Sequence, residues 1–180
     1  AWEAGNVWAP PTHDEDYARF VSAFAERYGD RIAAYQIWDE PNLSAHWGGQ
    51  YVDPAAYTAL LREGAIRVQE ADPGAIILLA ALAPTIEAGP LNLNEIDFLR
   101  QVIDAGGRHF FDAVALQPYG FADPPNAPGG SDRLNFARAA WVRRQMVRMG
   151  LGDVPVWATS WGWSAPLPGL EETAGPWPIV

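Results

Sequence analysis

The sequence predicts an α/β fold in which four buried parallel strands alternate with helices that cover the sheet. Short apolar runs rich in branched and aromatic residues occur at residues 33–38, 75–82, 111–116 and 154–159. Between these runs, apolar residues recur every three or four positions, as they do on one face of a helix. Runs that are apolar on both faces favour parallel strands, because helices cover both faces of most parallel sheets.

The four predicted helices open with residues that can cap a first turn and close near glycine or proline. They begin near Thr12, Asp53, Asn94 and Ser131 and end near Gly29, Asp72, Gly106 and Gly150. Thr12 and Glu15 have the spacing of a capping box. Asp53 is followed by a proline, which is favoured at the first position of a helix.

Two parallel-sheet architectures fit this alternation. A doubly wound open sheet is expected to carry a glycine-rich phosphate-binding turn after a strand, and none of the four runs is followed by one. The segments after the strands are long and rich in tryptophan and proline, which is typical of the ligand-binding loops of a barrel. We therefore predict part of a (β/α)8 barrel, with residues 1–180 forming one partial domain.

Composition restricts the classes of partner. The net charge of −10 argues against nucleic acid, whose phosphates require clustered lysine and arginine. The chain has no cysteine, which excludes disulfides and cysteine-bound zinc. No apolar run approaches the roughly 20 residues of a bilayer-spanning helix, and the first residues show no signal-peptide pattern. We expect no nucleic acid, no membrane span and no cofactor.

The most specific segment follows the first predicted strand and reads Trp38-Asp-Glu-Pro-Asn42, with Trp47 close behind. Residues 111–120 and 156–164 carry further motifs at the third and fourth strands. In this order, the three segments resemble the fourth, sixth and seventh strands of clan A glycoside hydrolases, the retaining cellulases, xylosidases and their relatives. The resemblance covers nearly the whole chain and implies about strands four to seven of a TIM barrel, with their helices.

The resemblance implies two catalytic positions, of which one is altered. Retaining glycosidases hold two carboxyl groups about 5–5.5 Å apart. Glu40 matches the acid/base, but Ser160 stands where the family has its nucleophilic glutamate. A serine hydroxyl without an adjacent base is a poor nucleophile, and the Gly-x-Ser-x-Gly elbow of serine hydrolases is absent. Asp39 and Gln117 replace the family's asparagine and histidine, which implies divergence from hydrolysis.

Aromatic residues after the strands indicate a sugar-binding rim, although about half of them are expected to be packing residues. These aromatic residues are Trp8, Trp47, Tyr51, Tyr119, Trp161 and Trp163. The expected substrate-binding residues are Trp8, Asp39, Asn42, Trp47, Gln117, Tyr119 and Trp161. His13, His46 and His109 show no metal-ligand spacing, so we expect surface or packing positions for them and no metal site.

Two functions remain open. The first is a non-catalytic descendant that serves as a carbohydrate-binding or structural subunit of a larger assembly. The second is an active glycosidase that hydrolyses O-glycosidic bonds with Glu40 as acid/base and a substitute carboxylate, for which Asp39, Asp123 and Glu171 are candidates. We favour the first, because a substitute carboxylate has to reach a rigid geometry. The resemblance leans towards an extracytoplasmic protein, but the sequence itself assigns no compartment.

Half a barrel leaves sheet edges and an apolar face exposed to water. Four βα units have two open sheet edges, and an apolar inner face then meets water. We expect the inward side chains to be Ile37, Ile77, Leu79, Val114 and Val156 or their immediate neighbours. A protein partner or further chain segments should therefore cover the edges, or the chain should self-associate.

Overall fold

The computed structural model describes residues 6–163 and confirms an α/β fold built on a parallel sheet. Four strands lie in the order of the chain: β1 (Ala34–Asp39), β2 (Ile76–Leu82), β3 (Ala113–Leu116) and β4 (Val156–Ala158). Each strand pairs in parallel with the next, with Leu79 opposite Ile37 and Val114 opposite Leu79. This sequential parallel order is that of neighbouring βα units in a barrel wall.

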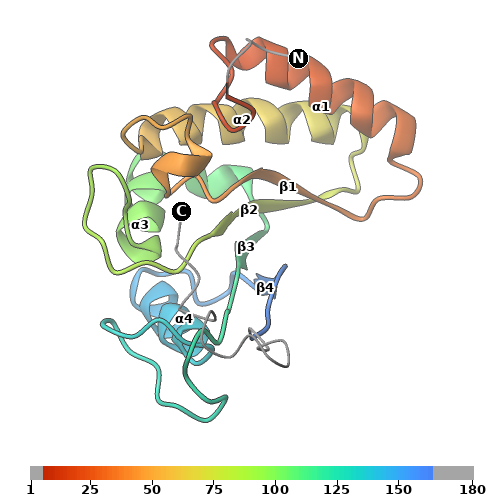
Figure 1. The fold of residues 1–180 in the computed structure, drawn as a ribbon. Coiled ribbons are helices and arrows are strands. Elements are labelled where there is room, and N and C mark those ends of the chain that lie inside the picture. The colour runs from red at the N-terminus through yellow and green to blue at the C-terminus, as the bar shows by residue number, and fades with distance from the viewer. Residues whose placement is uncertain (1–5, 164–180) are drawn as a thin grey trace, which may run out of the picture.

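The helices lie along one side of the curved sheet (Figure 1). They are α1 (Asp14–Tyr28), α2 (Pro54–Ala71), α3 (Glu95–Asp104) and α4 (Arg138–Arg148), with short 3-10 turns η1 (Ser44–His46) and η2 (Gly107–Phe110). The helix α1 packs beside α2, and α2 packs against α3. Among the described helices, none is long and apolar enough to cross a bilayer.

Two of the four predicted helix starts are right. The Asp53 side chain accepts hydrogen bonds from the backbone N–H groups of Ala55 and Ala56 at the start of α2. Asn94 caps α3 in the same way, by accepting from the N–H of Asp97. Both residues satisfy donors that the first helical turn leaves free.

The other two predicted caps do not form, although α1 begins within two residues of Thr12. The helix α1 begins after His13 without a side-chain cap, and its first turn carries three acidic residues that interact favourably with the helix dipole. The helix α4 begins at Arg138, later than the predicted cap at Ser131. The carbonyl groups of Ser131 and Arg133 accept hydrogen bonds from the Arg138 guanidinium, so the segment before α4 wraps around this side chain.

The side chains that we expected to point into the barrel face the helices instead. Ile37, Ile77, Leu79 and Val114 are buried in the main hydrophobic cluster, together with apolar residues of α2 and α3, and Val156 packs against the same cluster. The reason is the alternation of side chains along a strand, which sends every second residue to the same face. The prediction chose the wrong one of two apolar faces.

The opposite face of the sheet, which we call the inner face, is lined by alanines together with one leucine and one isoleucine. A second buried cluster lies there and consists of Leu78, Ala81, Ala113 and Ala115, against which Ala34 and Ile76 pack. These are the immediate neighbours that the sequence argument named as the alternative. Within the described residues, β1 and β4 are the edge strands of the sheet.

Candidate functional site

The residues that the sequence singled out lie at one rim of the sheet. Asp39 ends β1 and Glu40 follows it, while Gln117 follows β3 and Ser160 lies just beyond β4. Because the strands are parallel, these positions share the carboxyl-terminal rim, where barrel enzymes build their sites. Gln117 Nε2 donates to Asp39 Oδ1 over 3.3 Å, which links the ends of β1 and β3.

Glu40 is held at this rim by the sheet itself. Its backbone N–H donates to the carbonyl of Ala81 on β2 over 2.9 Å, and its φ of 46° lies in the left-handed region. Trp38 also has a positive φ, of 71°. Such backbone strain in non-glycine residues is concentrated at functional sites. The Glu40 side chain is only 15% exposed. Burial, assisted by the charge of Asp39, raises the pKa of Glu40 to about 7.

His46 joins the two carboxylates, a contact that the sequence argument missed. Its Nε2 lies 3.3 Å from Glu40 Oε2, and its Nδ1 lies 3.8 Å from Asp39 Oδ2. The imidazole stacks on Trp8 with ring centroids 4.5 Å apart. The His46 carbonyl accepts a hydrogen bond from Trp38 Nε1 over 2.9 Å. We expected a surface or packing residue; instead, the turn η1 folds His46 back onto the strand end, and its place soon after Glu40 was the available signal.

Asp39 is oriented by two amide side chains. Gln36 Nε2 donates to Asp39 Oδ1 over 3.1 Å, and Gln117 donates to the same oxygen. Asp39 Oδ2 is the oxygen that faces His46. Burial raises the pKa of Asp39, while His46 and the hydrogen bond from Gln36 partly oppose this rise. Within the described part of the chain, Asp39, Glu40 and His46 are the residues that could hold a metal ion, since one donor atom from each lies within 4.8 Å of the others.

Asn42 and Trp47 lie in the interior. Asn42 is fully buried, and its amide donates to the carbonyls of Ala83 and Leu93 and accepts from the N–H of Ala83. These bonds join the loop after β1 to the loop after β2. Trp47 is also buried and packs edge-on against Trp38 and Tyr57. Both side chains therefore support the rim from below.

The second side of the rim is formed by the loops after β3 and β4. The Tyr119 hydroxyl donates to Ser160 Oγ over 3.0 Å, and the Gly120 N–H donates to the carbonyl of Gly162. Trp163 packs over Gly120, where a Cβ atom would lie 1.7 Å from the indole Nε1. Trp161 is 66% exposed and is the most open aromatic ring on this side.

The substitute carboxylates have different surroundings. Asp123 accepts a hydrogen bond from Asn135 Nδ2 over 2.8 Å, and its carbonyl accepts from Trp163 Nε1. These bonds hold Asp123 within the loop after β3. Asp39 is the neighbour of Glu40 in the chain. Its Oδ2 lies 3.8 Å from His46 Nδ1, whereas Glu40 faces Nε2 of the same ring. Glu171 lies outside the described residues.

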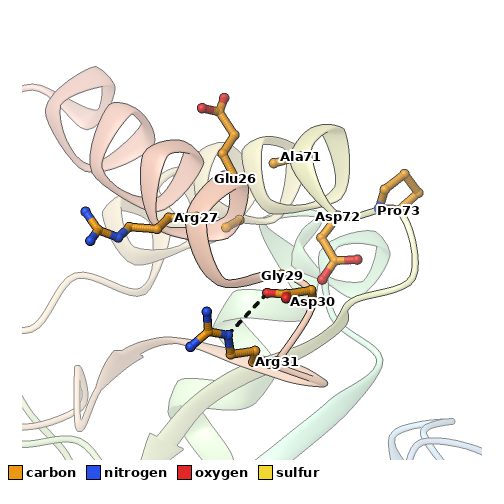
Figure 2. A pocket seen from close by; sticks show the side chains of 9 residues that line it. Glu26, Arg27, Gly29, Asp30, Arg31, Ala71, Asp72 and Pro73 are labelled. Atoms are coloured by element: carbon orange, nitrogen blue, oxygen red, sulfur yellow. Dashed lines mark ion pairs between the residues drawn. The ribbon is translucent and has the colours of Figure 1, made fainter.

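An open hollow elsewhere has no part in this rim. It has a volume of about 510 Å3 and lies between the carboxyl ends of α1 and α2, beside Arg27, Asp30, Arg31 and Asp72 (Figure 2). These helix ends lead into β1 and β2, so the hollow lies at the amino-terminal ends of the strands. In barrels this end serves stability, whereas the active site lies at the opposite end.

Comparisons with known proteins identify the fold. No family model and no curated protein sequence matches the chain. Among solved structures, it is similar to a glucosidase from Croceicoccus marinus, with 20% identity and a TM-score of 0.65 over 90% of this chain and 33% of that one. It is also similar to a β-xylosidase from Caulobacter crescentus, with 23% identity and a TM-score of 0.57 over 87% of this chain and 32% of that one.

A family 39 glycoside hydrolase from Bacteroides cellulosilyticus gives a similar result, with 22% identity and a TM-score of 0.60 over 87% of this chain and 32% of that one. The chain therefore spans about a third of the length of the structures it resembles. These similarities show that its fold is that of part of a (β/α)8 barrel, as in these three structures.

Proposed function

We propose that this chain is a glycoside-hydrolase-like protein that binds carbohydrate and does not carry out retaining hydrolysis. The observation that carries the proposal is the pair of positions at the rim. Glu40 is present and partly buried after β1, whereas the position after β4 holds Ser160, whose Oγ accepts a hydrogen bond from Tyr119. Retaining hydrolysis needs a second carboxylate there to form the glycosyl–enzyme bond.

The sugar site that we propose uses exposed rings and polar groups of the same rim. Trp8 and Trp161 are open aromatic surfaces beside β1 and beyond β4, and sugar rings stack on such surfaces. Asp39, Gln117 and Tyr119 supply hydrogen-bonding groups for hydroxyls. We leave Asn42 and Trp47 out of direct contact with the sugar, because both are buried. Xylosides and glucosides are the first ligands to test, given the names of the similar structures.

We also propose that further protein completes the pocket. The chain spans about a third of the similar structures, and β1 and β4 are the edge strands of the described sheet. Segments of a longer polypeptide or a separate subunit would pair with these edges and close the rim. A structural role in such an assembly is compatible with sugar binding.

Titration calorimetry with xylo- and gluco-oligosaccharides tests the binding proposal. We expect saturable binding that Trp161→Ala weakens about 2- to 12-fold, because a lost aromatic contact costs about 0.5–1.5 kcal/mol and each 1.4 kcal/mol is a factor of ten. Phe20→Ala is the matched control, since Phe20 is an exposed ring on α1 that packs on Tyr17 and Phe24. The proposal is wrong if neither class of oligosaccharide binds, or if Phe20→Ala weakens binding as much as Trp161→Ala.

Hydrolysis remains the second candidate, because Glu40 keeps the position and the burial of an acid/base at the rim. Turnover of aryl glycosides separates the two functions. We expect background rates that Glu40→Gln does not change. Robust turnover that Glu40→Gln abolishes would establish the second candidate. In a complete barrel, Ser160→Glu should restore activity if only the nucleophile is missing, and azide should form a glycosyl azide if Glu40 still acts as an acid.

A further inference from the structure

Three side chains with metal-binding chemistry converge where β1 ends. Asp39, Glu40 and His46 each place a donor atom within 4.8 Å of the others. The strand supplies the two carboxylates, and the turn η1 returns the imidazole to them. We propose that these three residues bind a divalent transition-metal ion, with zinc as the type ion.

The spacing of the donors suits such an ion. Zinc binds histidine nitrogen and carboxylate oxygen at about 2.0–2.2 Å in tetrahedral geometry, so neighbouring donors lie about 3.3–3.5 Å apart. His46 Nε2 and Glu40 Oε2 are 3.3 Å apart. Asp39 Oδ2 lies 3.8 Å from the other ring nitrogen, Nδ1, so the imidazole has to turn to offer one nitrogen to an ion shared by the three residues, whose donor atoms lie within 4.8 Å of one another. Imidazole together with carboxylates favours zinc, cobalt, nickel or copper over magnesium or calcium, which prefer oxygen donors alone.

The donors are held in place by groups outside the cluster. Gln36 and Gln117 both donate to Asp39 Oδ1. This leaves Oδ2, the oxygen nearer His46, for an ion. The imidazole plane is fixed by stacking on Trp8. Metal-binding carboxylates and histidines are generally oriented by such neighbouring contacts, whose loss costs 10- to 100-fold in affinity.

A second and independent observation comes from Gln117. This side chain is only 9% exposed and its amide rests on Asp39, yet its Oε1 is buried without a hydrogen-bond partner among the described residues. An unsatisfied buried polar atom costs about 1–3 kcal/mol. Three protein ligands leave the fourth tetrahedral position to water. Water bound to the ion is a donor that can satisfy this oxygen.

The charges of the two carboxylates also favour a bound cation. Asp39 and Glu40 are adjacent and partly buried, so their ionised forms repel each other in a medium that screens poorly. A divalent cation between them neutralises the pair and is then the largest local charge. Binding of the proposed ion does not require a sugar, so it can be tested independently of the proposed carbohydrate binding.

Titration of the full chain, first freed of metal with EDTA, tests the proposal. We expect saturable one-to-one uptake of Zn2+ by calorimetry, and Co2+ should give visible absorption bands typical of nitrogen and oxygen ligands. Asp39→Asn, Glu40→Gln and His46→Gln should each weaken Zn2+ binding at least tenfold. Gln117→Leu should weaken it about tenfold through the lost support of Asp39.

The matched control is His109→Gln, which removes an exposed histidine of η2 and should leave the affinity unchanged. Circular dichroism melts of every variant separate lost ligands from lost folding. If His46→Gln fails to fold, the near-isosteric Asp39→Asn and Glu40→Gln decide the matter. The proposal is overturned if neither Zn2+ nor Co2+ is taken up one-to-one, or if uptake is unchanged in the foldable ligand variants.

Discussion

At the scale of single residues, Tyr57 joins helix α2 to two strands through one hydroxyl group. The hydroxyl donates to the Ile37 carbonyl on β1 over 3.1 Å and accepts from the Ala80 N–H on β2 over 2.8 Å. Tyr57→Phe leaves both backbone groups buried and unpaired, so we expect a loss of about 1–3 kcal/mol in the free energy of unfolding. Urea denaturation measures this loss. The exposed Tyr51→Phe is the control, and equal stability of the two variants would contradict the assignment.

Tyr17 gives the fold a predictable response to alkaline pH. Burial raises the pKa of Tyr17 from its ordinary 10.0 to about 12. The folded state therefore holds the proton more tightly than the unfolded state. The resulting stability is fully present below pH 10 and is lost as the pH rises towards 12, by a few kcal/mol at most.

Thermal melts between about pH 9 and pH 12 test this response of Tyr17. We expect the melting temperature of Tyr17→Phe to fall less steeply with pH than that of the wild type. The variant should retain some sensitivity, because burial also raises the pKa of Tyr57. Parallel curves for the variant and the wild type would show that Tyr17 has no part in the response.

The sequence predicted the location of the candidate site but only part of its contacts. Glu40, Gln117 and Ser160 could be placed at one rim, because parallel strands end on the same side of a sheet. His46 could not be placed, since its contacts with Asp39 and Glu40 depend on how η1 turns. Residue type does not reveal that turn.

At the scale of secondary-structure elements, a buried ion pair ties α3 to α4 and to two loops. The Arg138 side chain pairs with Glu95, and both residues are almost fully buried. The Arg138 guanidinium also donates to the carbonyls of Thr85 in the loop after β2 and of Gly130 in the loop after β3. One side chain thus sets the course of both loops beneath the rim.

Removal of Arg138 should be more damaging than removal of the pair. We expect Arg138→Met to cost about 3–5 kcal/mol, because it leaves Glu95 buried without its partner. The double variant Arg138→Met with Glu95→Leu should recover part of this loss. Chemical denaturation of the single and double variants measures the coupling. Additive losses would mean that the two charges do not stabilise each other.

The sequence predicted the elements better than it predicted their faces. Capping by Asp53 and Asn94 is a local interaction, and local spacing was enough to find it. At the start of α4, the Arg138 guanidinium donates hydrogen bonds to the carbonyls of Gly130 and Thr85. No local sequence pattern encodes these contacts. Strands such as β2 are apolar on both faces, so alternation could not decide which side faces the helices.

At the scale of the whole molecule, we expect the open edges of the described sheet to govern the state of association. In the described sheet, β1 and β4 each lack one strand neighbour, and Trp157 on β4 is exposed. We expect the isolated chain to self-associate or to require a partner. Size-exclusion chromatography with light scattering measures this. A sharp monomer peak with a cooperative melt would contradict the expectation.

The alanines of the inner face also define what a completing wall of the barrel would have to contain. A barrel interior is filled by layers of side chains contributed by alternate strands, at a packing density close to that of an organic crystal. Ala34, Ala113 and Ala115 contribute little volume to these layers. If further strands complete the barrel, we expect them to supply bulky side chains opposite these alanines. This complementarity of volume is a criterion by which the other half can be recognised, whether it lies in the same polypeptide or in another.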